Sequence, residues 1–318
     1  MASVDILLAT YNGATHLREQ LDSLLRQDHV DWRLLVRDDG SSDSTLDILH
    51  EHARRFPDRI VVVLDTAVRL GLVGNFSALM QLATAPYVMF CDQDDIWFPD
   101  KISASLARLQ MLENGQPEVP ALVYTDLAVC DDKGARIADS YWRFQRINPD
   151  LALHPSGALI QDNATGNTFI FNQALNRLAA PVPRQAPGHD WWVALVALYA
   201  GKIAFLNRPT LDYRQHAHNA SGQKGLVLGG LLCKLPGYCK TMYVGHQQAR
   251  WLIERLHGYL SAGPAQRLQV HAAMPETSLF SRLLNLVRLG YWRVADRRAR
   301  FKLLYLLLCR RKDCRHGG

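Results

Sequence analysis

The chain has 318 residues, 48% of them apolar, which is enough to bury a substantial core in one large domain or two smaller ones. This composition excludes a disordered chain. The net charge of +6 is unevenly distributed, because residues 1–160 carry 14 basic and 23 acidic side chains, whereas residues 161–318 carry 22 and 7. The acidic half suits a bound cation, and the basic half suits phosphate, nucleic acid or an anionic membrane as a partner.

The first part of the chain alternates short apolar runs with amphipathic stretches of helical period. This alternation is typical of βαβ units around a mostly parallel sheet flanked by helices, a Rossmann-like α/β fold. The expected strands cover residues 4–9, 33–37, 60–64, 87–91 and 121–129, and the expected helices cover residues 14–27, 44–55, 73–84 and 100–113.

The second part begins with loops after residue 131 and ends in helices. We expect strands at 168–171, 202–206 and 210–213 that return to the same sheet, and a helix at 190–200. Beyond residue 222 the pattern predicts helices near 225–235, 240–261, 264–273, 277–289 and 291–311. The chain therefore divides into an α/β domain at 1–222 and a helical region at 223–318.

Targeting and redox signals are weak. The six cysteines show no C-x-x-C spacing, so neither a zinc module nor a disulfide framework is expected. No basic segment precedes the first apolar run, and no apolar stretch approaches the roughly 18–20 residues of a membrane span. We therefore expect a cytoplasmic protein with reduced thiols. We expect it to have neither a standard secretory signal nor a transmembrane helix.

Two polar loops follow the first two expected strands. Thr10, Tyr11, Asn12 and Gly13 come after the first, and residues 38–43 come after the second. Ligands of open parallel sheets bind at the carboxyl ends of strands, so these loops predict a nucleotide site in which an aromatic ring lies on the base and a carboxylate accepts a pyrimidine N–H. Ordinary turn chemistry is the alternative, because βα loops also favour these residue types.

Three carboxylates end the strand at 87–91. Asp92, Asp94 and Asp95 lie within four residues, where their mutual repulsion costs free energy unless a cation compensates. Oxygen ligands of this kind suit Mg²⁺ or Mn²⁺, which also coordinate substrate phosphates. A solvated acidic turn is the alternative.

Asp190 begins an apolar helix after a proline-rich loop. It could serve only as an N-cap, but a carboxylate at a helix N-terminus also stays ionised, as a general base requires. Trp191 and Trp192 follow it, and we expect one to pack in the core and one, assigned as Trp191, to face a sugar. Further along, the loop at 213–222 gathers Arg214, which suits a diphosphate, and His216, which suits a metal.

These motifs occur in the order found in family 2 glycosyltransferases of the GT-A fold. They read Thr-Tyr-Asn-Gly, Asp-Asp-Gly-Ser-Ser-Asp-x-Thr, Asp-Gln-Asp-Asp-Ile-Trp, His-Asp-Trp-Trp and Tyr-Arg-Gln-His-x-x-Asn-x-x-Gly. Over about residues 3–222 the chain resembles bacterial rhamnosyltransferase-like members that build surface polysaccharides.

The resemblance implies roles for individual residues. Asp190 takes the position of the family's catalytic base, and one departure is His189, where many relatives carry an acidic residue. The remaining implied roles are as follows: Thr10, Tyr11 and Asp39 hold the base with Asn12 nearby, Asp92 faces the ribose, Asp94 binds the metal, Asp95 steers the donor sugar, Gly166 and Asn167 line the donor-sugar site, and His216 adds a metal ligand.

The implied reaction is transfer of a sugar, with inversion, from dTDP-L-rhamnose or a UDP-sugar to a hydroxyl of a lipid-linked or growing surface glycan. The alternatives are a non-catalytic nucleotide-sugar or glycan binder and a sugar nucleotidyltransferase. A nucleic-acid partner is not expected, because the acidic residues 92–95 oppose it.

The C-terminal stretch is strongly basic. Residues 291–315 hold nine Arg or Lys side chains against two Asp, interleaved with apolar residues. This pattern predicts a basic amphipathic helix in peripheral contact with the anionic inner face of the plasma membrane. The alternatives are core packing and contact between subunits of a homo-oligomer.

Overall fold

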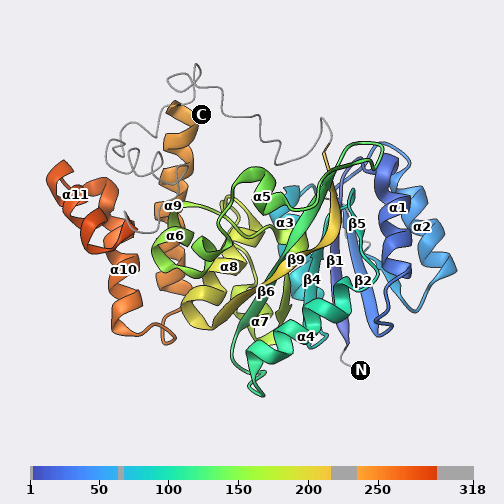
Figure 1. Ribbon diagram of the computed structural model, residues 1–318, viewed down its shortest axis with the longest axis horizontal. Coiled ribbons are helices and arrows are strands. Elements are labelled where there is room, and N and C mark those ends of the chain that lie inside the picture. Colours follow the sequence, from blue (N-terminus) through green and yellow to red (C-terminus); the bar gives the residue numbers. More distant parts are fainter. Residues whose placement is uncertain (1–2, 64–67, 216–234, 292–318) are drawn as a thin grey trace.

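The computed structural model describes residues 3–63, 68–215 and 235–291 of the chain (Figure 1). Its centre is a nine-stranded sheet of order β3-β2-β1-β4-β8-β6-β9-β5, with β7 paired to β6. The strands are β1 (Val4–Thr10), β2 (Trp32–Asp38), β3 (Ile60–Val62), β4 (Tyr87–Cys91), β5 (Ile96–Trp97), β6 (Ala121–Cys130), β7 (Arg136–Ala138), β8 (Ile170–Asn172) and β9 (Lys202–Arg214).

The sheet is mixed, with two groups of parallel strands on either side of the reversed strand β8, while β5 and β7 are also antiparallel to their neighbours. β1 pairs in parallel with β2 and β4, and β2 pairs in parallel with β3. β8 runs antiparallel between β4 and β6, while β6 and β9 are again parallel. The carboxyl ends of β1, β2, β4 and β6 therefore meet at one edge of the sheet, which positions the loops of the predicted site.

Helices cover both faces of the sheet. Along β1, Ile6 and Leu8 point into one apolar core and Leu7 and Ala9 into the other, as the two-residue period of a strand requires. The first core is closed by α1 (Ala14–Leu25), α2 (Thr45–Arg55) and α4 (Lys101–Glu113), and the second by α3 (Gly71–Leu82), α6 (Pro155–Ile160), α7 (Gln173–Ala179) and α8 (His189–Ala200).

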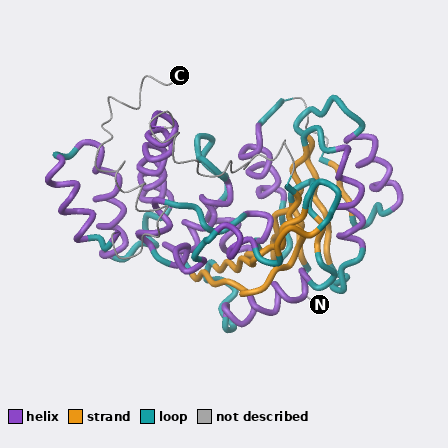
Figure 2. The backbone as a smooth tube through the Cα atoms, turned by 45° about the horizontal axis from the view of Figure 1, so that its top comes forward, coloured by secondary structure: helices purple, strands orange, loops and turns teal. Residues whose placement is uncertain are grey.

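The helical part that follows packs onto the second core. Its helices are α9 (Leu235–Arg255), α10 (Ala262–Ala273) and α11 (Leu279–Arg288), with α5 (Tyr141–Gln145) and short 3₁₀ turns at Pro149–Leu153 and Met274–Glu276 elsewhere in the chain. Leu252 and Leu256 of α9 lie in the same core as α8. Figure 2 shows the strands gathered in one half of the molecule and the other half built of helices.

The structure confirms the predicted mixed α/β architecture and refines it in two places. The strands expected at 202–206 and 210–213 are one strand, β9, whose register shifts where Pro209 faces Asp126, because proline cannot donate to the ladder. The strand expected at 168–171 starts at Ile170, since a 3₁₀ turn, η2 (Gly166–Thr168), precedes it. The helix expected at 291–311 and most of the one at 225–235 lie outside the described residues. In the part of the chain that is described, every helix is too short or too polar to cross a membrane.

Candidate active site

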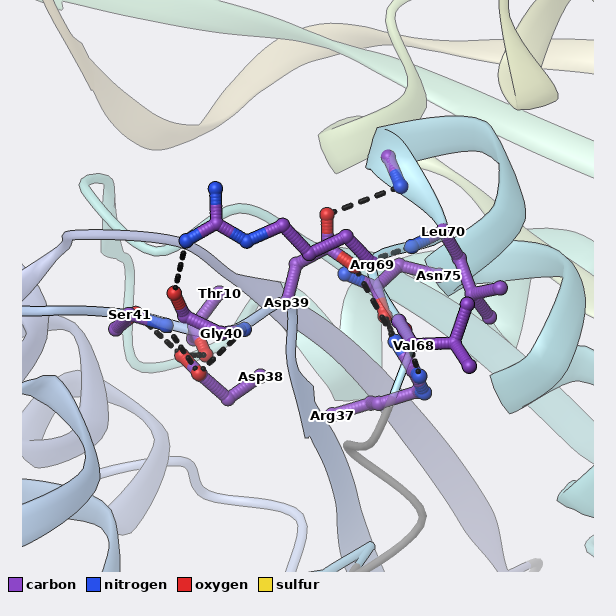
Figure 3. Close-up of polar contacts among 11 residues, drawn as sticks. Thr10, Arg37, Asp38, Asp39, Gly40, Ser41, Val68, Arg69, Leu70 and Asn75 are labelled. Atoms are coloured by element: carbon purple, nitrogen blue, oxygen red, sulfur yellow. Dashed lines mark hydrogen bonds and ion pairs between the residues drawn. The ribbon is translucent and has the colours of Figure 1, made fainter.

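The loops after β1 and β2 are joined by a buried carboxylate. Asp38 accepts hydrogen bonds from the Thr10 hydroxyl (2.9 Å) and from the backbone N–H groups of Gly40 and Ser41 (2.9 and 2.7 Å) (Figure 3). Gly40 has φ +82°, a conformation that favours glycine. Asn12 adds a second link by accepting from the Ser42 N–H at 2.8 Å. The hydroxyl of Thr10 and the amide of Asn12 therefore shape the loops from within.

Asp39 is in the loop after β2, and its side chain lies against the N-terminus of α3. Its two carboxylate oxygens accept from the backbone N–H groups of Leu70 (2.7 Å) and Gly71 (3.0 Å). Beneath it, the buried guanidinium of Arg37 contacts Asp39, the carbonyl of Val68 and the side chain of Asn75 (Figure 3). A carboxylate offers about four acceptor positions, so Asp39 keeps acceptor capacity for a ligand N–H. Arg37 was not predicted, although a charged residue inside an apolar strand is a readable signal.

Tyr11 presents an open ring at this edge of the sheet. Its side chain is 47% exposed, and the Arg69 guanidinium carbon lies 5.2 Å from the ring centroid. Arg69 also donates to the Gly40 carbonyl at 2.9 Å. The backbone N–H of Tyr11 donates to Gln93 at 2.9 Å, and Gln93 donates back to the Tyr11 carbonyl. This pair of bonds ties the first loop to the acidic loop, residues 92–95.

The acidic loop is charged and poorly solvated. Burial and the neighbouring charges of Asp94 and Asp190 raise the pKa of Asp92 to about 7. Asp95 is buried, and burial with the charges of Asp94 and Asp92 raises its pKa well above the usual range. One oxygen of Asp95 accepts from Asn167 at 2.5 Å, and the other is a buried oxygen without a hydrogen-bond partner among the described residues.

Lys101, the first residue of α4, is the buried cation behind this loop. Its ammonium group donates to the Asn167 carbonyl (3.0 Å) and the Thr210 hydroxyl (3.3 Å) and lies 4.6 Å from a Trp97 ring centroid. Burial lowers the pKa of Lys101 to about 7, against the opposing effect of Asp95. Lys101 thus joins η2, β9 and β5. Its partners are distant in sequence, so the sequence analysis did not find it.

Asp190 lies in the first turn of α8, beside η2. Its carboxylate accepts from the backbone N–H of Gly166 (3.2 Å) and from its own helix at Trp191 (2.8 Å). A methyl group added at Gly166 would lie 2.8 Å from the Asp190 Cβ, and one at Gly188 would lie 2.4 Å from a carboxylate oxygen. Because the charge of Asp190 raises the pKa of Asp92, the two carboxylates share one site although 98 residues separate them.

The two aromatic neighbours of Asp190 are core residues. Trp191 and Trp192 are both buried, and their ring N–H groups donate to the carbonyls of Ala158 and Ala179. The prediction that Trp191 offers an open platform to a sugar is therefore wrong for this structure. His189 stacks on Phe76 at 3.8 Å between ring centroids, and burial lowers its pKa to about 4. A neutral ring thus stands beside the carboxylate.

Arg214 acts inside the protein. All three guanidinium nitrogens donate, to the Asp94 carbonyl (3.2 Å), the Asp132 carbonyl (2.8 Å) and the Glu19 carboxylate (2.6 Å). It therefore braces the acidic loop, and contact with a diphosphate stays a prediction. His216 lies outside the described residues. Within residues 3–63, 68–215 and 235–291, no group of three acidic, His or Cys side chains is arranged to hold a metal ion.

The chain also resembles known proteins. Residues 5–116 match the family model described as Glycosyl transferase family 2. The dTDP-rhamnosyl transferase RfbG of Shigella flexneri is 31% identical over 224 residues, which cover 68% of this chain and 73% of that protein. The chain belongs to glycosyl transferase family 2. This membership makes it a glycosyltransferase.

Two further comparisons concern a donor and an acceptor. An Escherichia coli family relative, WfgD, named UDP-Glc:alpha-D-GlcNAc-diphosphoundecaprenol beta-1,3-glucosyltransferase, is 31% identical over 111 residues, 35% of this chain and 42% of that protein. The mannosyltransferase PcManGT from Pyrobaculum calidifontis, solved with GDP-Man and Mn²⁺, superposes with a TM-score of 0.54 at 18% identity, covering 96% of this chain and 85% of that one. At this identity the likeness establishes the GT-A fold alone.

Proposed function

We propose that this glycosyltransferase moves a sugar, with inversion and with a divalent cation, from a nucleotide-sugar to a hydroxyl of a bacterial surface glycan. The observation that carries the proposal is that η2 holds both groups, because the Gly166 N–H donates to Asp190 and the Asn167 side chain donates to Asp95 of the acidic loop. One carboxylate on the donor side and one at a helix N-terminus are the two groups that a single displacement needs. Such a reaction forms no covalent intermediate, so it needs no nucleophilic side chain.

The nucleotide binds at the ends of β1 and β2. The exposed ring of Tyr11 offers a face for the base, and Asp39 keeps acceptor capacity for a base N–H. Because Asp38 binds the Thr10 hydroxyl, we assign Thr10 to holding the shape of this site. A carboxylate acceptor selects a base with a ring N–H, which thymine, uracil and guanine have and adenine and cytosine lack. The named substrate of the Shigella relative supports dTDP-rhamnose, and a UDP-sugar remains the second candidate.

The acidic loop fits a divalent cation. Its carboxylates are hard oxygen ligands, and their crowding raises the pKa of Asp92, a cost that a bound cation removes. Asp94 is the residue that would hold Mg²⁺ or Mn²⁺, with His216 as a candidate further ligand and Asp92 beside it facing the ribose. Bound there, the cation would stabilise the charge that develops on the departing nucleoside diphosphate.

Asp190 is proposed as the base that takes the proton of the acceptor hydroxyl. The Gly166 N–H and the positive end of the α8 dipole both interact with its carboxylate, which can accept the proton of an approaching hydroxyl. Both contacts also fix where its oxygens lie. The buried neutral ring of His189 adds no competing negative charge beside it.

The donor sugar is proposed to lie between the acidic loop and η2. The Asp95 carboxylate is held by the Asn167 amide, and Gly166 leaves room because it has no side chain. The Lys101 ammonium group holds η2 in place by donating to the Asn167 carbonyl. Asp95, Gly166 and Asn167 then position the sugar relative to Asp190.

The acceptor class is proposed from a relative. The name of the Escherichia coli relative describes transfer to a sugar on diphosphoundecaprenol, a lipid-linked acceptor. A lipid-linked or growing glycan at the cytoplasmic face of the membrane is therefore the proposed acceptor for this chain.

A donor panel tests the proposal directly. The protein is incubated with dTDP-, UDP- and GDP-sugars, with Mg²⁺, Mn²⁺ or EDTA, and release of the nucleoside diphosphate is followed. We expect release from a pyrimidine donor that EDTA abolishes. Turnover of a GDP-sugar alone would contradict the base assignment, and full activity in EDTA would contradict the metal assignment. Formation of sugar nucleotide and pyrophosphate from sugar phosphate would indicate a nucleotidyltransferase instead.

A further inference from the structure

Helix α11 buries a charged side chain and exposes most of its apolar side chains. Arg282 is 3% exposed, and its guanidinium donates to the carbonyls of Thr277 (3.2 Å) and Pro275 (2.9 Å). Phe280, by contrast, is 76% exposed, and four neighbours on the same helix are each more than half exposed. The exposed set is Leu279, Phe280, Leu283, Leu284 and Val287.

This apolar stripe is presented by a fixed helix. Residues at spacings of three and four lie on one face of a helix, so Phe280, Leu283, Leu284 and Val287 form a continuous row. The N-terminus is capped by Ser278, which accepts from the Ser281 N–H. Past the C-terminus, the Leu289 carbonyl accepts from Ser156 and Arg267, both at 2.7 Å. Apolar side chains held in water in this way mark a contact surface.

The charge of this end of the chain indicates the partner. Residues 235–318 carry 15 Lys and Arg side chains against four Asp and Glu, and Arg288 ends α11 itself. α11 lies at the end of the molecule opposite α1 and α2, away from the acidic loops (Figure 1). A second copy on this face would bring two strongly basic regions together, because a two-fold interface pairs each patch with itself. An anionic lipid surface instead offers both hydrocarbon and negative charge.

We propose that the α11 stripe is a membrane-docking surface that inserts Phe280, Leu283, Leu284 and Val287 into the interface of an anionic phospholipid bilayer. Arg288, in the last turn of α11, contacts the lipid phosphates. The docking surface is independent of the reaction chemistry at Asp190. It would hold the enzyme beside a lipid-linked acceptor without any spanning helix.

Vesicle co-sedimentation of the full chain tests the surface. The wild type and the double variant Phe280→Gln/Leu284→Gln are mixed with phosphatidylcholine vesicles, with or without about 30% phosphatidylglycerol. The matched control is Met111→Gln, a substitution of a side chain that is 73% exposed on α4 at the sheet end. We expect the wild type and the control to bind the anionic vesicles, and the double variant to bind about tenfold or more weakly.

Two measurements without vesicles test whether another part of the chain or a second copy covers the α11 stripe instead of a membrane. Because the stripe faces water, the double variant should keep the wild-type melting temperature and the wild-type sedimentation coefficient. A fall of several degrees would mean that another part of the chain covers the stripe, and dissociation of a dimer would mean that a second copy does. Either result, or equal vesicle binding by wild type and double variant, would overturn the proposal.

Discussion

Replacing Gly166 by alanine should damage catalysis without damaging the fold. Gly166 lies against Asp190, to which it donates a hydrogen bond, and its own backbone conformation is open to any residue. An added methyl group would lie 2.8 Å from the Asp190 Cβ, 3.2 Å from its nearer carboxylate oxygen and 3.3 Å from His189 Nε2. The added methyl group would therefore clash with Asp190, the proposed base.

The size of the effect follows from these distances. Ordinary contact with a Cβ begins at 3.4 Å, so Asp190 or η2 must move by at least about 0.6 Å. Neither can move easily, since Trp191 and Trp192 anchor α8 in the core and Lys101 anchors η2. A misplacement approaching 1 Å at a reacting group costs about 10²-fold in rate. We expect kcat to fall by about 10- to 100-fold, with a small change in donor affinity.

Steady-state release of nucleoside diphosphate measures kcat, and calorimetric titration measures donor affinity. The control is Gly263→Ala in α10, where an added methyl group meets nothing within 4 Å. This substitution should leave kcat unchanged and stabilise the helix by up to about 1 kcal/mol. If Gly166→Ala turns over like the wild type, Asp190 does not depend on its packing against η2, and the account of how the base is placed is refuted.

Three further predictions concern charge. Lys101→Met removes the donor to the Asn167 carbonyl and the Thr210 hydroxyl and should lower the free energy of unfolding by about 1–3 kcal/mol, whereas exposed Lys133→Met should leave it nearly unchanged; equal denaturation curves would contradict the burial argument. Because the pKa of Asp92 is raised to about 7, calorimetric affinity for Mn²⁺ should fall as pH decreases through 7, and a pH-independent affinity would show that the charge of Asp92 does not act on the cation. Burial lowers the pKa of His189 and of His246 to about 4, so the unfolded chain binds more protons below its own value of about 6.5. The stability that each histidine contributes should therefore be full above about pH 6.5 and fall toward pH 4 by about 1.4 kcal/mol per unit, while the raised pKa values of Asp92 and Asp95 act in the opposite direction. The stability difference between the wild type and His246→Phe isolates one histidine, and a difference that stays constant from pH 7 to 5 would refute this.

The order of strands and helices could be predicted because it is a local property. The run at β1 alternates sides of the sheet with a period of two, and its residues divide between the two cores as that period requires. The break in β9 was read as two strands because Pro209 interrupts the pattern. Only the pairing with β6, seen in the structure, shows that the chain continues through it.

The candidate site was predicted only in part, because side-chain roles depend on distant partners. Asp39 and Asp190 stand out in the sequence, each after a strand or before a helix. Lys101 does not, since its position in a helix favours a solvated side chain and its burial comes from Asn167 and Thr210. The sequence predicts that Arg214 contacts a phosphate. In the structure its three nitrogens donate to Glu19 and to two backbone carbonyls, and these partners are too far away in the sequence to be predicted from it.

The same limit applies to the aromatic residues near α8. Two adjacent tryptophans beside a carboxylate are compatible with sugar stacking or with a core. The structure decides between these for Trp191 through its ring N–H bond to Ala158, 33 residues away in sequence. Tyr11 is the ring that stays open, and its loop position after β1 was the readable signal.

The most direct test of the central claim is Asp190→Asn. The amide keeps the size of the side chain and its place at the start of α8, but it cannot take a proton from the acceptor. The account predicts that kcat falls by at least about 10²-fold while the donor binds with nearly wild-type affinity. Turnover near the wild-type rate, or loss of donor binding in step with activity, would contradict the role of Asp190 as the base.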